Sequence, residues 1–123
     1  MKKLILLLLP ALCFSCYQAE PNCGHFKTGN YESEITVNGK KKKTLSVRTN
    51  SMVIETYDGK TDTASIRWIN DCEYVLQKTN PKTMQEKKAI DIKILTTSKN
   101  SYTFEFGLVG SDAKQKGKAK QLN

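Results

Sequence analysis

The chain has 123 residues, of which 38% are hydrophobic and 26% charged, and its 20 basic and 12 acidic side chains give a formal net charge of +8. This length predicts one small domain with a single modest hydrophobic core, and a domain this small usually needs a covalent staple. The positive charge is compatible with anionic partners, but no glycine-rich phosphate loop or RNA-binding aromatic motif accompanies it, so nucleic-acid binding is not predicted.

Residues 1–15 have the features of a secretory signal peptide. Lys2 and Lys3 precede an apolar run from Leu4 to Phe14 that is too short to span a bilayer as a helix. Removal of this segment takes away two lysines and leaves 18 basic against 12 acidic residues.

The residue after this segment is a candidate for lipid attachment. Ser15 directly before Cys16 resembles the lipobox of bacterial lipoprotein signals, in which Cys13 is an atypical neighbour. We therefore predict a lipoprotein signal peptide over residues 1–15 and a lipid anchor on Cys16, which holds the protein to a membrane. The alternatives are cleavage near Ala19 without lipid and a true membrane helix.

Residues 16–22 form the predicted lipidated tether, and residues 23–123 a single β domain. Tyr17 to Glu20 resembles the short Gln-Ala-acidic signal that sends some Bacteroidetes lipoproteins to the outer face of the outer membrane. We predict an outer-membrane lipoprotein that faces either the periplasm or the surface.

Two cysteines remain in the exported domain, because Cys13 leaves with the signal and Cys16 carries lipid. In an oxidising compartment Cys23 and Cys72 are predicted to form a disulfide that closes a loop of about 50 residues. A metal site with His25 is the alternative, but it has only three ligands and no second histidine. Cys–His catalysis needs a free thiolate. We therefore predict no metal, no cofactor and no enzymatic activity.

Apolar residues repeat at every second position along the domain, which is typical of half-buried strands. Only residues 52–57, MVIETY, leave open which side faces inward. The residues predicted to face the interior are Tyr31, Ile35, Val37, Leu45, Val47, Ala64, Ile66, Trp68, Cys72, Tyr74, Leu76, Ile90, Ile92, Ile94, Tyr102, Phe104, Phe106 and Leu108.

Short turns connect these strands. Asn38-Gly39 and Asp58-Gly59 supply the positive-φ pairs of tight hairpins. We predict an all-β fold of seven or eight strands, a small antiparallel up-and-down barrel of lipocalin-like type, with a curled open sheet or a sandwich as the alternative.

Two segments are less regular. Residues 80–88 are predicted to form a helical turn with Asn80 as its cap and Pro81 at the first helical position. Residues 113–122, AKQKGKAKQL, alternate weakly and are predicted to form a last edge strand whose lysines discourage edge-to-edge pairing.

The aromatic residues share the inward face, and they suggest what the interior does. The candidate ligand-binding residues are Tyr31, Trp68, Tyr74, Tyr102 and Phe104. Strands this short favour a filled interior over a usable cavity. Two non-catalytic functions follow: an envelope lipoprotein that binds a small hydrophobic or amphipathic ligand, or a structural or interaction subunit with a filled core that contacts an envelope protein. Internal volume discriminates between them.

Four consecutive lysines, Lys40, Lys41, Lys42 and Lys43, follow the first tight turn. They are a candidate anion contact, for lipopolysaccharide phosphates or an acidic polysaccharide. The alternative is a solvated hairpin tip that keeps an edge soluble. Glu55, near the second turn, is interpreted as a solvated acid rather than a member of a catalytic carboxylate pair.

The blocks CGHFKTGNY, IRWINDCEYVL and SYTFEFGLVG resemble a group of small lipoproteins from Bacteroidetes, especially flavobacteria. The resemblance covers nearly the whole mature chain, with Trp-x-x-Asp-Cys-Glu-Tyr as its most specific part. It implies a secreted β-rich lipoprotein of undefined biochemical role. Some members carry the name of a DNA topoisomerase IV subunit, which does not fit, because a chain this short and exported behind a lipobox cannot house a strand-passing enzyme.

Overall fold

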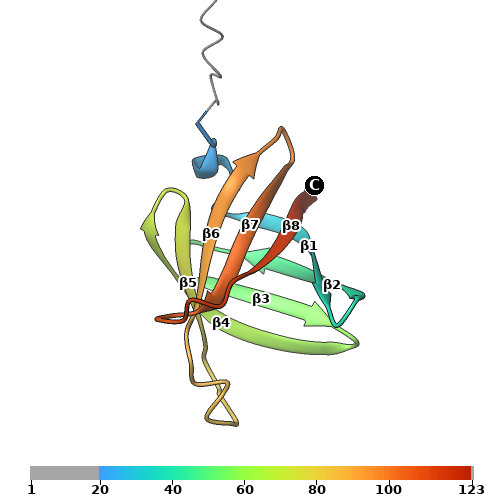
Figure 1. Cartoon of the computed structure of the whole chain (residues 1–123), viewed down its shortest axis with the longest axis vertical. Helices are drawn as coiled ribbons and strands as arrows, with labels where there is room; N and C mark the ends of the chain where they lie inside the picture. Colours follow the sequence, from blue (N-terminus) through green and yellow to red (C-terminus); the bar gives the residue numbers. More distant parts are fainter. Residues whose placement is uncertain (1–19, 123) are drawn as a thin grey trace, which may run out of the picture.

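The structure, a computed structural model, describes residues 20–122, which form eight antiparallel strands that close into a barrel in sequence order (Figure 1). A short 3-10 helix, η1 (Cys23–Phe26), precedes β1 (Gly29–Val37), β2 (Lys40–Arg48), β3 (Met52–Tyr57), β4 (Lys60–Asn70), β5 (Glu73–Lys78), β6 (Ile90–Thr97), β7 (Ser101–Leu108) and β8 (Gln115–Leu122). The predicted up-and-down barrel is confirmed. The predicted signal peptide and Cys16 lie outside the described residues. Within residues 20–122, no helix is long and apolar enough to cross a membrane.

Both predicted tight turns are present. Asn38 and Gly39 have φ angles of 51° and 76°, and Asp58 and Gly59 have 47° and 72°. A two-residue turn with positive φ at both positions matches the twist of the strands that it joins. Each turn therefore also fixes the register of its hairpin.

The first hairpin reverses the predicted orientation of β2. Leu45 and Val47, predicted to face inward, are 50% and 48% exposed, whereas Ser46 and Arg48 are only 5% and 6% exposed. The reason is the register, which places Ser46 directly opposite the buried Tyr31. Residues directly opposite each other project on the same face of a sheet, so Ser46 and Arg48 must face the interior.

The second hairpin settles the orientation of residues 52–57. Val53 pairs with Ala64, and Glu55 pairs with Asp62. Because Ala64 faces the interior as predicted, Val53 and Glu55 do so too, and Ile54 lies on the outside with 45% of its surface exposed.

The last strand closes the barrel, so its prediction as an edge strand is wrong. β8 pairs with β1 on one side and with β7 on the other. Its small residues make this closure sterically feasible, because Gly117 lies opposite both Ile35 and Phe104 and Ala119 lies opposite Tyr102. A larger residue at Gly117 would overlap the side chains of these two neighbours.

The segment between β5 and β6 forms a single turn, and its predicted cap is wrong. The backbone N–H of Lys87 donates to the carbonyl of Thr83 at 3.2 Å. The Thr83 hydroxyl accepts from the N–H of Glu86 at 3.1 Å, and the Glu86 carboxylate accepts from the N–H of Lys82 at 2.7 Å. This reciprocal arrangement resembles a capping box, and it moves the cap from Asn80 to Thr83.

We predict that Gly117→Ala destabilises the barrel. An added Cβ would lie 2.6 Å from Cζ of Phe104 and 2.8 Å from Cγ2 of Ile35, so the closing strand must shift. Such overpacking costs roughly 1–3 kcal/mol. The free energy of unfolding from urea titrations measures it. Gly24→Ala is the matched control, because no atom beyond its chain neighbours and its own helix lies within 4 Å of an added Cβ. Equal unfolding midpoints for the two variants would contradict this account of closure.

Candidate functional site

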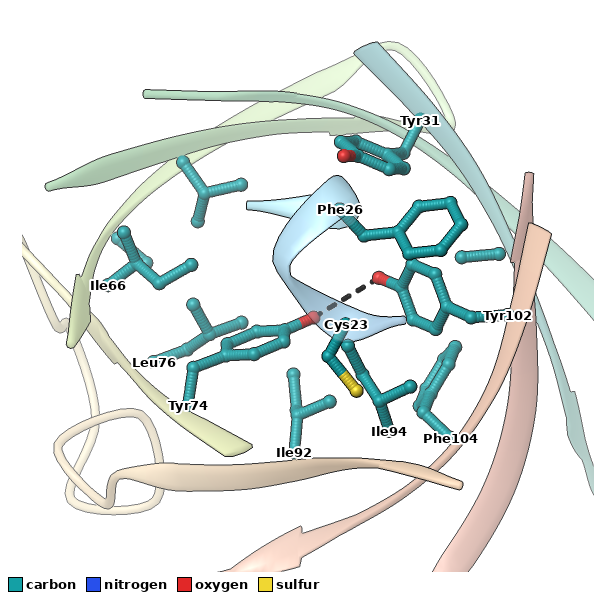
Figure 2. Close-up of a cluster of buried hydrophobic side chains, with 13 residues drawn as sticks. Cys23, Phe26, Tyr31, Ile66, Tyr74, Leu76, Ile92, Ile94, Tyr102 and Phe104 are labelled. Carbon is teal, nitrogen blue, oxygen red and sulfur yellow. Dashed lines mark hydrogen bonds between the residues drawn. The ribbon is translucent and has the colours of Figure 1, made fainter. Parts of the chain in front are cut away.

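One end of the barrel is closed by η1, which lies across the opening (Figures 1 and 2). Phe26 is completely buried there, with its ring centroid 5.1 Å from that of Tyr102. Tyr31 is also completely buried, and its ring lies 6.2 Å from that of Tyr102. A packed aromatic cluster therefore fills this end.

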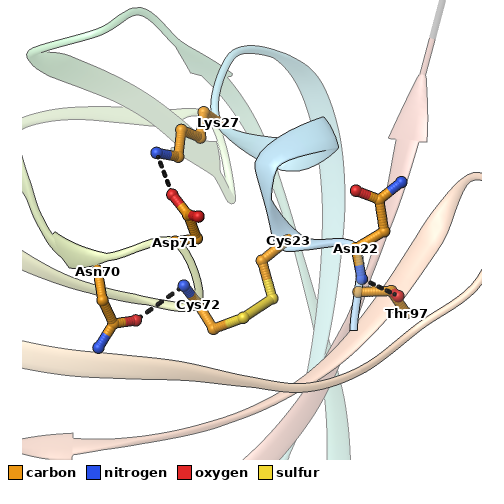
Figure 3. The surroundings of a disulfide bond; sticks show 7 residues. All are labelled: Asn22, Cys23, Lys27, Asn70, Asp71, Cys72 and Thr97. Atoms are coloured by element: carbon orange, nitrogen blue, oxygen red, sulfur yellow. Dashed lines mark hydrogen bonds and ion pairs between the residues drawn. A yellow bond between two sulfur atoms is a disulfide. The ribbon is translucent and has the colours of Figure 1, made fainter. Parts of the chain in front are cut away.

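The predicted disulfide fixes this closure. The Cys23 and Cys72 sulfurs are bonded at 2.07 Å, which ties η1 to the turn between β4 and β5 (Figure 3). Next to it, Lys27 Nζ lies 2.9 Å from Asp71 Oδ1, and the N–H of Asn22 donates to Thr97 Oγ1 at 2.8 Å. The thiols that the alternative metal site would use are thus bonded to each other.

The other end of the barrel holds a cavity of about 400 Å³. Side chains therefore do not fill the whole interior, contrary to the expectation from the short strands. The connecting segment between β5 and β6 borders the mouth through Gln85, Glu86 and Lys88. The apolar wall of the cavity consists of Ile35, Val53, Ala64, Leu76, Ile90, Ile92, Phe104, Phe106 and Leu108.

The candidate ligand-binding aromatics divide between the two ends. Tyr74, Tyr102 and Phe104 line the cavity. Tyr31 belongs to the packed cluster, and Trp68 contacts Tyr74 with a ring separation of 4.6 Å but does not line the cavity. The structure thus brings three of the five predicted residues to the cavity.

Arg48 forms the boundary between the packed end and the cavity, and sequence reasoning missed it. Its guanidinium donates to the carbonyl of Phe26 at 3.2 Å and to the hydroxyl of Tyr102. It also lies over the ring of Tyr31, 4.0 Å from the centroid, in cation–π contact. The signal that could have placed Arg48 in the interior is the two-residue turn at Asn38-Gly39. This turn fixes the register of β1 and β2 and thereby turns Arg48 inward.

The electrostatics of this boundary keep Arg48 charged and Tyr74 neutral. Burial works to lower the pKa of Arg48, but the pKa is raised overall because the charged guanidinium donates to Tyr102 and lies among tyrosines that lose their protons less readily when it is neutral. Burial raises the pKa of Tyr74 well above its usual range, which Arg48 only partly opposes. At neutral pH the closed end of the cavity thus presents a cation and phenol hydroxyls.

Acidic and basic side chains mix near the mouth. Lys78 Nζ lies 3.1 Å from Glu86 Oε1 and 3.5 Å from Asp62 Oδ2. Glu55 lines the cavity, so its interpretation as a solvated acid near a turn is wrong, because the hairpin register turns it inward. Burial raises the pKa of Glu55, with Arg48 opposing the shift.

The lysine run divides between the two faces of β2. Lys41 and Lys43 lie 3.6 Å from Glu34 and 3.8 Å from Glu32, in exposed pairs that contribute little to stability. Lys40 and Lys42 pair in register with Val37 and Ile35. Since Ile35 lines the cavity, these two lysines lie on the inner face of the strand at the mouth end. The anion contact itself stays a prediction.

No protein-family model, curated protein or solved structure matches this chain. The kind of ligand that the cavity could bind must therefore be inferred from the residues that line it. An apolar side, a buried cation at the closed end and mixed charges at the mouth suit an elongated molecule with one polar end.

We predict that Glu55→Gln stabilises the protein at about pH 7 and has a smaller effect at about pH 3. The raised pKa means that the folded state binds the Glu55 proton more tightly than the unfolded state, whose pKa is about 4.3. The protonated Glu55 side chain therefore contributes to the free energy of unfolding at low pH, and this contribution is lost as pH rises through the folded-state pKa. Glutamine carries no charge at either pH, so the variant does not lose it. Urea unfolding at both pH values measures the difference.

Glu105→Gln, on the outer face of β7, is the matched control. The chain carries excess positive charge, so deletion of a negative charge outside the cavity is not expected to stabilise it. A gain at neutral pH that is equal for both variants would contradict the role assigned to burial at Glu55.

Proposed function

We propose that this protein is a non-catalytic lipoprotein of the bacterial cell envelope whose barrel binds a small amphipathic molecule. The observation that carries the proposal is the cavity of about 400 Å³, which lies within the size range of small-molecule sites. Its apolar wall on β6 and β7 suits a hydrocarbon group, and the buried Arg48 at its closed end suits a polar one.

The anchor of this lipoprotein is proposed to be lipid on Cys16. The described chain reaches the barrel through η1 at the closed end, opposite the mouth (Figure 1). A lipid seven residues before Cys23 would attach the protein by this end. The mouth would then face away from the membrane, and the ligand would exchange with the aqueous phase or with a partner rather than directly with the bilayer.

Binding by the cavity is tested with the neutral fluorescent probe N-phenyl-1-naphthylamine and a soluble protein that begins at Tyr17. We expect a saturable rise in fluorescence for one bound molecule. Ala64→Phe places a ring in the cavity and is expected to weaken binding by roughly tenfold or more, about 1.4 kcal/mol. Ala113→Phe, at an exposed position in the segment before β8, is the control and should bind as the wild type does.

If the wild type does not bind the probe, the ligand-binding proposal is wrong. Equal binding by both alanine variants would show that the probe sits elsewhere. Either result would leave an interaction subunit as the remaining reading of the sequence.

The lipid anchor is tested separately by Cys16→Ser in the full chain, expressed in a bacterium of the Bacteroidetes. The wild type is expected to enter the detergent phase of a Triton X-114 extraction, and the variant the aqueous phase, because lipid chains dominate partitioning. Cys13→Ser is the matched control and should behave as the wild type. If the Cys13→Ser variant entered the aqueous phase and the Cys16→Ser variant stayed in the detergent phase, the lipid would be on Cys13 and the prediction would be wrong.

A further inference from the structure

The closed end of the cavity is rich in hydrogen-bond donors. Four polar residues line it, here called the cationic floor: Ser46, Arg48, Tyr74 and Tyr102. Resting on the proposed function, we propose that the cationic floor binds the carboxylate of an elongated alkyl carboxylate, whose hydrocarbon chain extends along β6 and β7 toward the mouth.

The hydrogen-bond inventory of the floor shows a surplus of donors. The Arg48 guanidinium has about five N–H donors, and its two hydrogen bonds leave the others without a hydrogen-bond acceptor among the described residues. The Tyr74 and Tyr102 hydroxyls share one bond of 3.3 Å, so one of their two protons has no acceptor within residues 20–122 (Figure 2). The buried Ser46 hydroxyl also has no partner in that part of the chain. This surplus of donors suits a ligand group that accepts hydrogen bonds.

Charge points the same way. Arg48 is 6% exposed, and across the described residues no carboxylate lies within ion-pair distance of it. A buried charge with no counter-ion in direct contact is costly. The tyrosine rings, the Phe26 carbonyl, the Tyr102 hydroxyl and the more distant Glu55 offset only part of that cost. A carboxylate supplies the opposite charge and matches the planar fork of a guanidinium.

The apolar wall fits the rest of such a molecule. Phe104, Phe106 and Leu108 follow one another along β7 from the floor toward the mouth, and Ile92 and Ile90 do so along β6. The four residue steps from Phe104 to Leu108 span about 13 Å of strand. A single unbranched chain can therefore lie against apolar side chains while its head reaches Arg48.

Glu55 provides a test of whether the ligand head is negatively or positively charged. It pairs with Ser46, one inward position nearer the mouth than Arg48, and makes no hydrogen bond with the floor among the bonds formed by residues 20–122. Its negative charge opposes a ligand carboxylate and would favour a ligand ammonium. Glu55→Gln should therefore tighten binding of the first and weaken binding of the second.

The test is isothermal titration of the soluble protein with decanoate, 1-decanol and decylamine, which share one chain length and differ in the head. We expect decanoate to bind roughly tenfold or more tightly than 1-decanol, and decylamine to bind most weakly. Ser46→Ala should weaken decanoate by a few-fold and leave 1-decanol unchanged. Glu55→Gln should tighten decanoate and weaken decylamine. Arg48→Met, if it folds, should remove the preference for decanoate.

The possible failures are distinguishable. If 1-decanol or decylamine binds as tightly as decanoate, or if Ser46→Ala and Glu55→Gln leave decanoate unchanged, the carboxylate inference is overturned and the ligand-binding proposal stands. If none of the three probes binds, while the protein also fails to bind the neutral fluorescent probe, the proposed function falls together with it.

Discussion

The buried guanidinium of Arg48 is the interaction on which the rest of the structure depends. It joins the Phe26 carbonyl of the closing helix to the Tyr102 hydroxyl of β7 and stacks on Tyr31 of β1, so it connects the start of the domain to a strand that is distant in sequence. Burial of a charge is costly, and the cluster offsets this with aromatic faces and hydrogen bonds rather than with a carboxylate. The barrel is therefore closed by a polar contact that leaves positive charge facing inward.

This arrangement divides the interior into a packed half and a hollow half. On the packed side, the disulfide between Cys23 and Cys72 spans 49 positions and contributes about 4 kcal/mol in the chain-entropy model, which holds η1 in place. Gly117 and Ala119 of β8 allow closure against large neighbours, and the cavity of about 400 Å³ occupies the other end. A packed end and a hollow end suit a protein that binds a ligand through the mouth.

Sequence patterns predicted the strands, the tight turns and the disulfide, because alternation, Asn-Gly or Asp-Gly pairs and an even thiol count are local signals. The orientation of β2 was predicted wrongly from Leu45 and Val47, although the turn at Asn38-Gly39 already implied the opposite face once Tyr31 was placed inward. Register outweighed local hydrophobicity there. The cavity could not be predicted, because it depends on how side-chain volumes combine around a closed barrel. The anchor at Cys16 stays a prediction.

A crystal structure of the soluble protein with decanoate tests the central claim most directly. The account predicts one elongated molecule inside the barrel, with its carboxylate within hydrogen-bond distance of Arg48 and its chain against Phe104 and Phe106. An interior filled by rearranged side chains, or a ligand bound with its carboxylate at the mouth and its alkyl end at Arg48, would contradict it.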